Sequence, residues 1–173
     1  MKIARVSLAL AAMVLAGLPA VAGCAATPRP VQNNTYSWQS LTISLPVGKW
    51  FAEEDGRIVI LTCPGKPGNF AVQVSPLDDQ SRRAQSVLAR ELFVHFTNKQ
   101  LSKSSAITIA DIPATSFQVI AREGDREVKI LAVVLAQRDR VCDFVCWSDP
   151  ADFDQTSQLF DELLKGVKFK GRL

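Results

Sequence analysis

Residues 115–147 read TSFQVIAREGDREVKILAVVLAQRDRVCDFVCW and contain three apolar runs separated by two polar triplets. The runs are residues 115–122, 127–136 and 140–147. They are rich in Val, Ile, Phe and Leu, which favour strands, and the triplets between them are short enough for hairpin turns. This stretch therefore predicts a meander of adjacent antiparallel strands.

Shorter strands are expected on the N-terminal side of this meander. They are residues 41–45, 57–63, 70–74 and 106–109. The first alternates apolar and polar side chains, and Pro46 and Gly48 end it before Trp50 and Phe51. The Pro/Gly-containing residues 64–69 join the second to the third, which predicts a hairpin.

Two amphipathic helices are expected. The first spans residues 81–100, which contain no Gly or Pro, and its apolar face comprises Leu88, Ala89, Leu92, Phe93 and Phe96. The second follows Ser148-Asp149-Pro150 and runs to about Lys165, with Gly166 placed to stop it. Its apolar face comprises Phe153, Leu159, Phe160, Leu163 and Leu164.

The order of these elements, βββ–α–ββββ–α, predicts the α+β class. We expect a largely antiparallel sheet with both helices packed on one face, and a single domain over residues 40–170. The length of 173 residues, with 47% hydrophobic and 21% charged residues, is typical of one globular domain. Its apolar residues suffice for a domain that folds without a metal or a disulfide, and we expect no cofactor.

The charge balance gives no support for nucleic-acid binding. The formal charge is +3, but Lys2 and Arg5 lie in a segment that we expect to be removed, which leaves 18 basic against 17 acidic residues. The only basic cluster is C-terminal and comprises Lys165, Lys168, Lys170 and Arg172. A solvated helix end and tail, or a contact with a membrane surface, explains such a cluster.

Residues 1–23 have the features of a secretory signal peptide. Lys2 and Arg5 precede an apolar run over residues 6–18, and small residues follow Pro19. A membrane-spanning helix needs about 20 apolar residues, so this run is too short for a permanent transmembrane anchor.

The four residues Val21-Ala22-Gly23-Cys24 resemble the lipobox of bacterial lipoproteins. The resemblance implies cleavage before Cys24, a diacylglycerol on its thiol and usually an acyl chain on its amino group. Ala25 is not the Asp of the inner-membrane retention signal, so in a Gram-negative host the resemblance favours the outer membrane, facing the periplasm. The alternative is an ordinary signal peptide cleaved near residues 20–22.

Residues 24–39 are expected to form the lipidated, flexible tether. They are polar, contain Pro and show no apolar period. Some 13 residues allow a reach of about 40 Å from the bilayer.

Three local signatures resemble the PsbP-like superfamily, which includes the Ran-binding Mog proteins and many bacterial lipoproteins. They are Leu-Pro-Val-Gly-Lys-Trp at 45–50, Ile-Ala-Asp-Ile-Pro-Ala at 109–114 and Phe-Asp-Glu-Leu-Leu-Lys-Gly-Val-Lys-Phe at 160–169. The resemblance implies an α/β sandwich, and a role as an assembly or regulatory partner rather than as a catalyst. Asp111 departs from the pattern, because a Gly often stands there.

Three cysteines besides Cys24 leave several pairings open. Cys142 and Cys146 would be about 13 Å apart within one extended strand, which is too far for a disulfide. Cys63 could bridge to either of them in an oxidising compartment, or all three could be buried thiols.

Few residues have the chemistry of a catalytic or metal site. His95 is the only histidine, which excludes multi-His metal sites, and no nucleophile elbow or nucleotide-binding loop occurs. An acidic group around the start of the last helix raises the hypothesis of a calcium site, although its spacing does not fit an EF-hand loop. The group comprises Asp143, Asp149, Asp152 and Asp154. The alternative is that Asp149 caps the helix, with Pro150 just inside it.

Three functions follow from these observations. The first is a non-catalytic envelope lipoprotein whose domain docks a protein partner or supports an assembly. The second is a carrier or sensor that binds a small apolar or lipid ligand between sheet and helices. The third, a hydrolase, lacks a recognisable set of catalytic residues.

Overall fold

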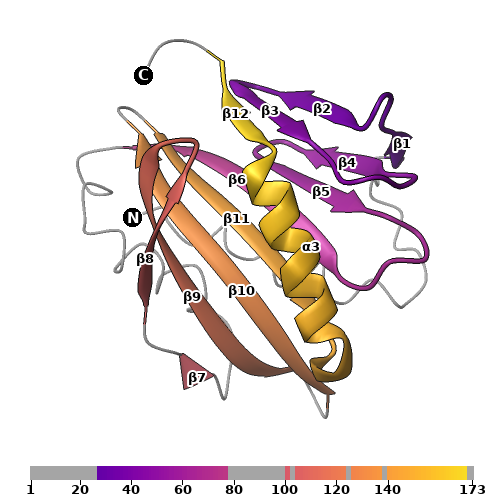
Figure 1. Ribbon diagram of the computed structural model, residues 1–173, viewed down its shortest axis with the longest axis vertical. Coiled ribbons are helices and arrows are strands. Elements are labelled where there is room, and N and C mark those ends of the chain that lie inside the picture. Colours follow the sequence, from indigo (N-terminus) through magenta and orange to yellow (C-terminus); the bar gives the residue numbers. More distant parts are fainter. Residues whose placement is uncertain (1–26, 78–99, 102–103, 124–125, 138–139, 171–173) are drawn as a thin grey trace.

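The computed structural model describes residues 27–77, 100–101, 104–123, 126–137 and 140–170, whose strands form two sheets (Figure 1). The larger sheet has nine strands in the order β1-β4-β5-β6-β11-β10-β9-β7, and β8 also pairs with β9. Its strands are β1 Arg29–Pro30, β4 Phe51–Asp55, β5 Ile58–Thr62, β6 Asn69–Pro76, β7 Gln100–Leu101, β8 Ser105–Ile109, β9 Ile112–Glu123, β10 Arg126–Gln137 and β11 Arg140–Ser148. The smaller sheet has the order β12-β3-β2, with β12 Val167–Phe169, β3 Leu41–Ser44 and β2 Thr35–Trp38. All of these pairings are antiparallel.

The predicted meander is confirmed. β9 pairs with β10 and β10 with β11, and the hairpin of β5 and β6 joins it because β6 pairs with β11. β11 thus lies in the middle of the larger sheet and is buried on both faces. Cys142, Phe144 and Cys146 lie on one of these faces, and Val145 and Trp147 on the other.

The last helix is also confirmed. It consists of a short 3₁₀ turn, η1 Pro150–Asp152, followed by α3 Phe153–Lys165, and all five expected apolar residues are buried. Figure 1 shows α3 lying across one face of the larger sheet and continuing into β12. Phe70 connects the layers, because its ring lies 5.7 Å from that of Trp50 and 6.3 Å from that of Phe160.

The expected packing of two helices on one face is confirmed only in part. The sheet is antiparallel and α3 covers one face, but residues 81–99 of the helix expected over 81–100 lie outside the described residues. Its expected last residue, Gln100, instead begins β7. The opposite face also buries apolar side chains, among them Phe117, Ile130 and Trp147, in a second cluster separate from that under α3.

The expectation of a flexible tether over residues 24–39 is wrong from Arg29 onward. β1 pairs with β4, and β2 pairs with β3. Trp38 at the end of β2 is buried in the main core. Backbone pairing and this aromatic anchor hold the segment in the fold, so the described domain begins at Arg29 rather than at residue 40.

Candidate functional site

A cavity of about 570 Å³ lies where the two sheets meet at the N-terminal edge of the fold. It is lined by Thr27, Arg29, Pro30, Val31, Tyr36, Ala52, Glu54 and Gly56. Pairing of Arg29 with Ala52 puts these two side chains on one face of the larger sheet, and Glu54 shares that face because it is two residues along β4. Tyr36 comes from β2 of the smaller sheet. The cavity is therefore a product of the contact between the two sheets.

A short hydrogen bond crosses this cavity. The Tyr36 hydroxyl donates to Oε1 of Glu54 over 2.6 Å. Burial, this bond and the negative charge of Glu54 together raise the pKa of Tyr36 above its ordinary value, whereas the charge of Arg29 opposes them. Tyr36 therefore remains a protonated donor at neutral pH and holds one oxygen of the carboxylate in place.

Sequence reasoning missed this site because Arg29 and Tyr36 lie in the segment expected to be a tether. One signal was present in the sequence. Tyr36 and Trp38 alternate with the polar Thr35 and Ser37, which is the period of a strand with one buried face.

The three cysteines of the domain are unpaired, buried thiols. Cys63, Cys142 and Cys146 all belong to the main core cluster, and Cys142 and Cys146 lie on the same face of β11. Burial, reinforced by the neighbouring Asp143, raises the pKa of Cys142 to about 12. Burial raises the pKa of Cys146 as well. The structure thus favours the alternative in which these cysteines pack as small apolar side chains.

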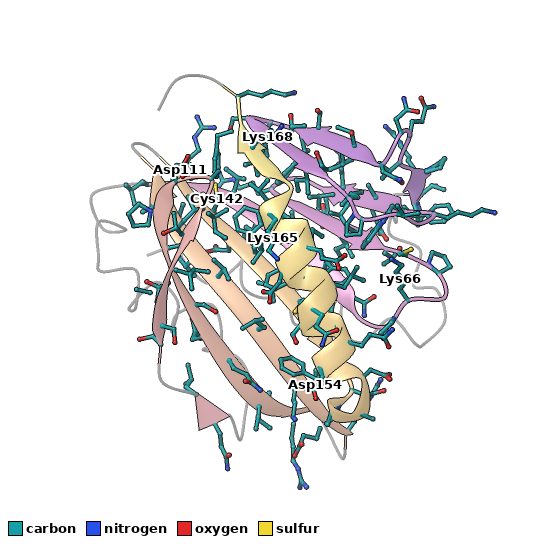
Figure 2. The ribbon with its side chains drawn as sticks, in the orientation of Figure 1. Lys66, Asp111, Cys142, Asp154, Lys165 and Lys168 are labelled. Atoms are coloured by element: carbon teal, nitrogen blue, oxygen red, sulfur yellow. The ribbon has the colours of Figure 1, made fainter. Side chains whose placement is uncertain are left out.

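The four acidic residues considered for calcium do not form one cluster. Across the described ranges, no three His, Cys, Asp or Glu residues come together as metal ligands. Asp143 is buried within β11, and burial raises its pKa to about 7. Asp152 and Asp154 are exposed at the start of the helix. Figure 2 shows Asp154 on α3.

The expectation that the side chain of Asp149 caps the helix is wrong. Its carboxylate accepts two hydrogen bonds from Arg126, at 2.7 and 2.8 Å, and makes no bond to the helix backbone. The guanidinium lowers the pKa of Asp149. Pro150 does occupy the first position of η1, as expected.

The remaining predicted site residues are dispersed or undescribed. Lys165 ends α3, Lys168 lies on β12, and both are exposed (Figure 2). Lys170 is exposed as well. Arg172, His95 and the lipobox residues Val21, Ala22, Gly23 and Cys24 lie outside the described residues.

Similar proteins were found at the level of structure. No protein-family model matches the sequence, and no curated protein matches it. A solved structure of cyanobacterial PsbP from Synechocystis sp. PCC 6803 matches with a TM-score of 0.57 over 90% of this chain and 99% of that one, at 13% identity. The fold is PsbP-like.

Two further solved structures share this fold. LpqN of Mycobacterium tuberculosis, described as involved in cell envelope biogenesis, matches with a TM-score of 0.56 at 15% identity, over 84% of this chain and 91% of that one. A Bacteroides thetaiotaomicron protein matches with a TM-score of 0.56 at 10% identity. The match covers 77% of this chain but only 46% of the Bacteroides chain.

Within the part of the chain that the structure describes, no helix combines the length and hydropathy needed to cross a membrane.

Proposed function

We propose that this protein is a non-catalytic lipoprotein of the cell envelope, anchored by lipid on Cys24, whose PsbP-like domain binds a partner or supports an assembly. In a Gram-negative host the domain faces the periplasm from the outer membrane. The observation that carries the proposal is the sequence Val21-Ala22-Gly23-Cys24 directly after an apolar export segment. Several acyl chains, at ~0.8 kcal/mol per buried methylene, make such an anchor stable.

Two further observations support the proposal. The PsbP-like fold occurs in LpqN, which is described as involved in cell envelope biogenesis. The charges of the chain after residue 23 nearly cancel, so a membrane-bound form would depend on its lipid rather than on a general electrostatic attraction.

The anchor is tested by replacing its cysteine. In the native host, Cys24→Ala is expected to abolish incorporation of radiolabelled palmitate and to prevent processing of the precursor. Cys63→Ala is the matched control, because it removes a cysteine from the core and leaves the lipobox intact. Equal labelling of the Cys24→Ala variant and the parent would contradict the proposal.

The role of the domain is tested by crosslinking in the intact envelope followed by mass spectrometry. A protein crosslinked repeatedly to this chain is expected if the domain docks a partner. The absence of any such protein would favour the second candidate function, binding of a small ligand. The observation that favours this second candidate is the cavity of about 570 Å³ with its convergent polar groups.

A further inference from the structure

The cavity is lined by one cationic and one anionic side chain that form no ion pair with each other. Arg29 and Glu54 both line it, and no ion pair between them occurs among the interactions of the described residues. Tyr36 donates to Oε1 of Glu54, which leaves Oε2 able to accept a further hydrogen bond. Both charged side chains are exposed at the mouth of the cavity, so a ligand can reach them from solvent.

The floor of the cavity is less polar than its mouth. Ala52 is 4% exposed, and Val31 is half-buried and packs against the main core. The N–H of Val31 is bonded to the Trp50 carbonyl over 2.8 Å, which fixes the position of this floor. A ligand whose two charged groups are joined by a short hydrocarbon linker fits such a surface.

The position of the cavity along the chain is as informative as its chemistry. Thr27 lines the cavity and lies three residues after Cys24. Three residues span at most about 11 Å. A lipid on Cys24 would therefore hold Thr27, and with it one side of the cavity, within about 11 Å of the bilayer surface, since the chain cannot reach further.

We propose that this cavity binds a compound in which a primary ammonium and a phosphate are joined by a short linker, as in phosphoethanolamine. The guanidinium of Arg29 pairs with the phosphate, for which its planar set of donors is suited. The ammonium donates to Oε2 of Glu54, while Tyr36 keeps that carboxylate in position. The membrane-proximal position, which rests on the lipid anchor proposed above, makes the head group of a phospholipid one source of this ligand, and free phosphoethanolamine is the other.

Tyr36 provides a site-specific probe, because it is the only tyrosine of the chain. The mature lipoprotein, purified in detergent with ¹³C-labelled tyrosine, would be titrated with O-phosphoethanolamine, O-phosphocholine and glycerol 3-phosphate while the Tyr36 resonance is recorded. Phosphocholine has no ammonium hydrogen to donate and glycerol phosphate has no cation. We expect a saturable shift with phosphoethanolamine and affinities at least about tenfold lower for the other two.

Three variants test whether the shift of the Tyr36 resonance arises from binding in the cavity. Arg29→Gln and Glu54→Gln should each weaken phosphoethanolamine binding by about tenfold or more, since each removes one charge-assisted hydrogen bond. Glu53→Gln is the matched control, because it is adjacent in β4 and faces the other side of the strand. Circular dichroism checks that all three variants remain folded.

A second arm distinguishes the two sources. The labelled lipoprotein would be placed in nanodiscs of phosphatidylethanolamine or of phosphatidylcholine. A Tyr36 shift that appears only with phosphatidylethanolamine identifies the lipid head group, and a shift seen only with the soluble compound identifies a free ligand; either result supports the proposal. The proposal is overturned if neither arm gives a shift, if phosphocholine binds equally well, or if Glu54→Gln binds as the parent does. The titration with soluble phosphoethanolamine can be interpreted even if Cys24 carries no lipid. A negative result for the lipid anchor and a negative result for ligand binding in the cavity are therefore distinguishable.

Discussion

Gly166 lies directly against the backbone of Ser44. The N–H of Ser44 donates to the carbonyl of Gly166 over 2.9 Å, and a Cβ at residue 166 would overlap the Ser44 carbonyl oxygen. This contact connects the end of α3 to β3, and it allows β12 to pair with β3 immediately afterwards. The glycine thus joins the helix to the smaller sheet.

Substitution of Gly166 by Ala is expected to destabilise the fold by about 2–4 kcal/mol, because the clash is with backbone rather than with a flexible side chain. Gly56→Ala is the comparison, since residue 56 has a φ of 58° but open space around its Cβ position. It should cost only about 1 kcal/mol, the cost of the left-handed backbone. Urea denaturation of both variants measures the difference, and equal losses would contradict the steric explanation.

Asp143 is expected to make stability depend on pH. Burial raises its pKa from 3.8 to about 7, so the carboxyl group is protonated in the folded state at a pH where it is ionised in the unfolded state. The contribution of this carboxyl group to the free energy of unfolding is fully present below about pH 4 and is lost as pH rises through about 7. Asp143→Asn should therefore gain about 2–4 kcal/mol relative to the parent at pH 8, but little at pH 4.

Urea denaturation of the parent and of Asp143→Asn at the two pH values measures this linkage. Asp154→Asn, an exposed substitution on α3, serves as the control. Parallel pH profiles for the parent and the Asp143→Asn variant would show that the buried carboxyl is not responsible.

The turn between β8 and β9 is expected to gain stability from glycine. Ala110 and Asp111 form this two-residue connection with φ values of 46° and 65°, both in the left-handed region. Glycine adopts this conformation without strain, so Ala110→Gly and Asp111→Gly should each stabilise the protein by about 0.5–1 kcal/mol. Thr108→Gly, within β8, should destabilise it by a similar amount. Thermal unfolding of the three variants checks both signs.

The three domain cysteines are expected to be unreactive until the protein unfolds. Burial disfavours the thiolate of Cys142, whose pKa is raised to about 12, and keeps reagents away from Cys63 and Cys146. With Ellman's reagent at pH 8 and without reductant, the Cys24→Ala variant, in which only the three domain cysteines remain, should show no fast-reacting thiol when native and three when denatured. A single thiol after denaturation would instead indicate a disulfide between Cys63 and one of the other two.

The central part of the fold was predictable because its strands are long and strongly apolar. The meander and α3 have continuous sequence patterns. The edge strands β1, β2 and β4 were not predicted. Their residues are mostly polar, which weakens the sequence pattern of a strand. β1 forms by pairing with β4, a segment distant in the chain, whereas β2 and β4 each pair with the next strand along the chain.

The candidate site could not be predicted for the same reason. Arg29 and Glu54 are 25 residues apart, and only the pairing of β1 with β4 brings them to one face. A similar long-range contact explains the error over Asp149, because the local pattern indicates a cap whereas Arg126, 23 residues earlier, binds the carboxylate. Local rules give no information about such partners.

The short strand β1 also determines what the outer edge of the larger sheet can do. It covers β4 only at Phe51 and Ala52, and beyond it β4 continues with three acidic residues, Glu53, Glu54 and Asp55. On β1 itself, Pro30 has no N–H to offer to another strand. Charge along one part of the edge and a missing donor on the other both discourage strands of neighbouring molecules from extending the sheet. Proteins crowded on one surface could otherwise aggregate through such an edge.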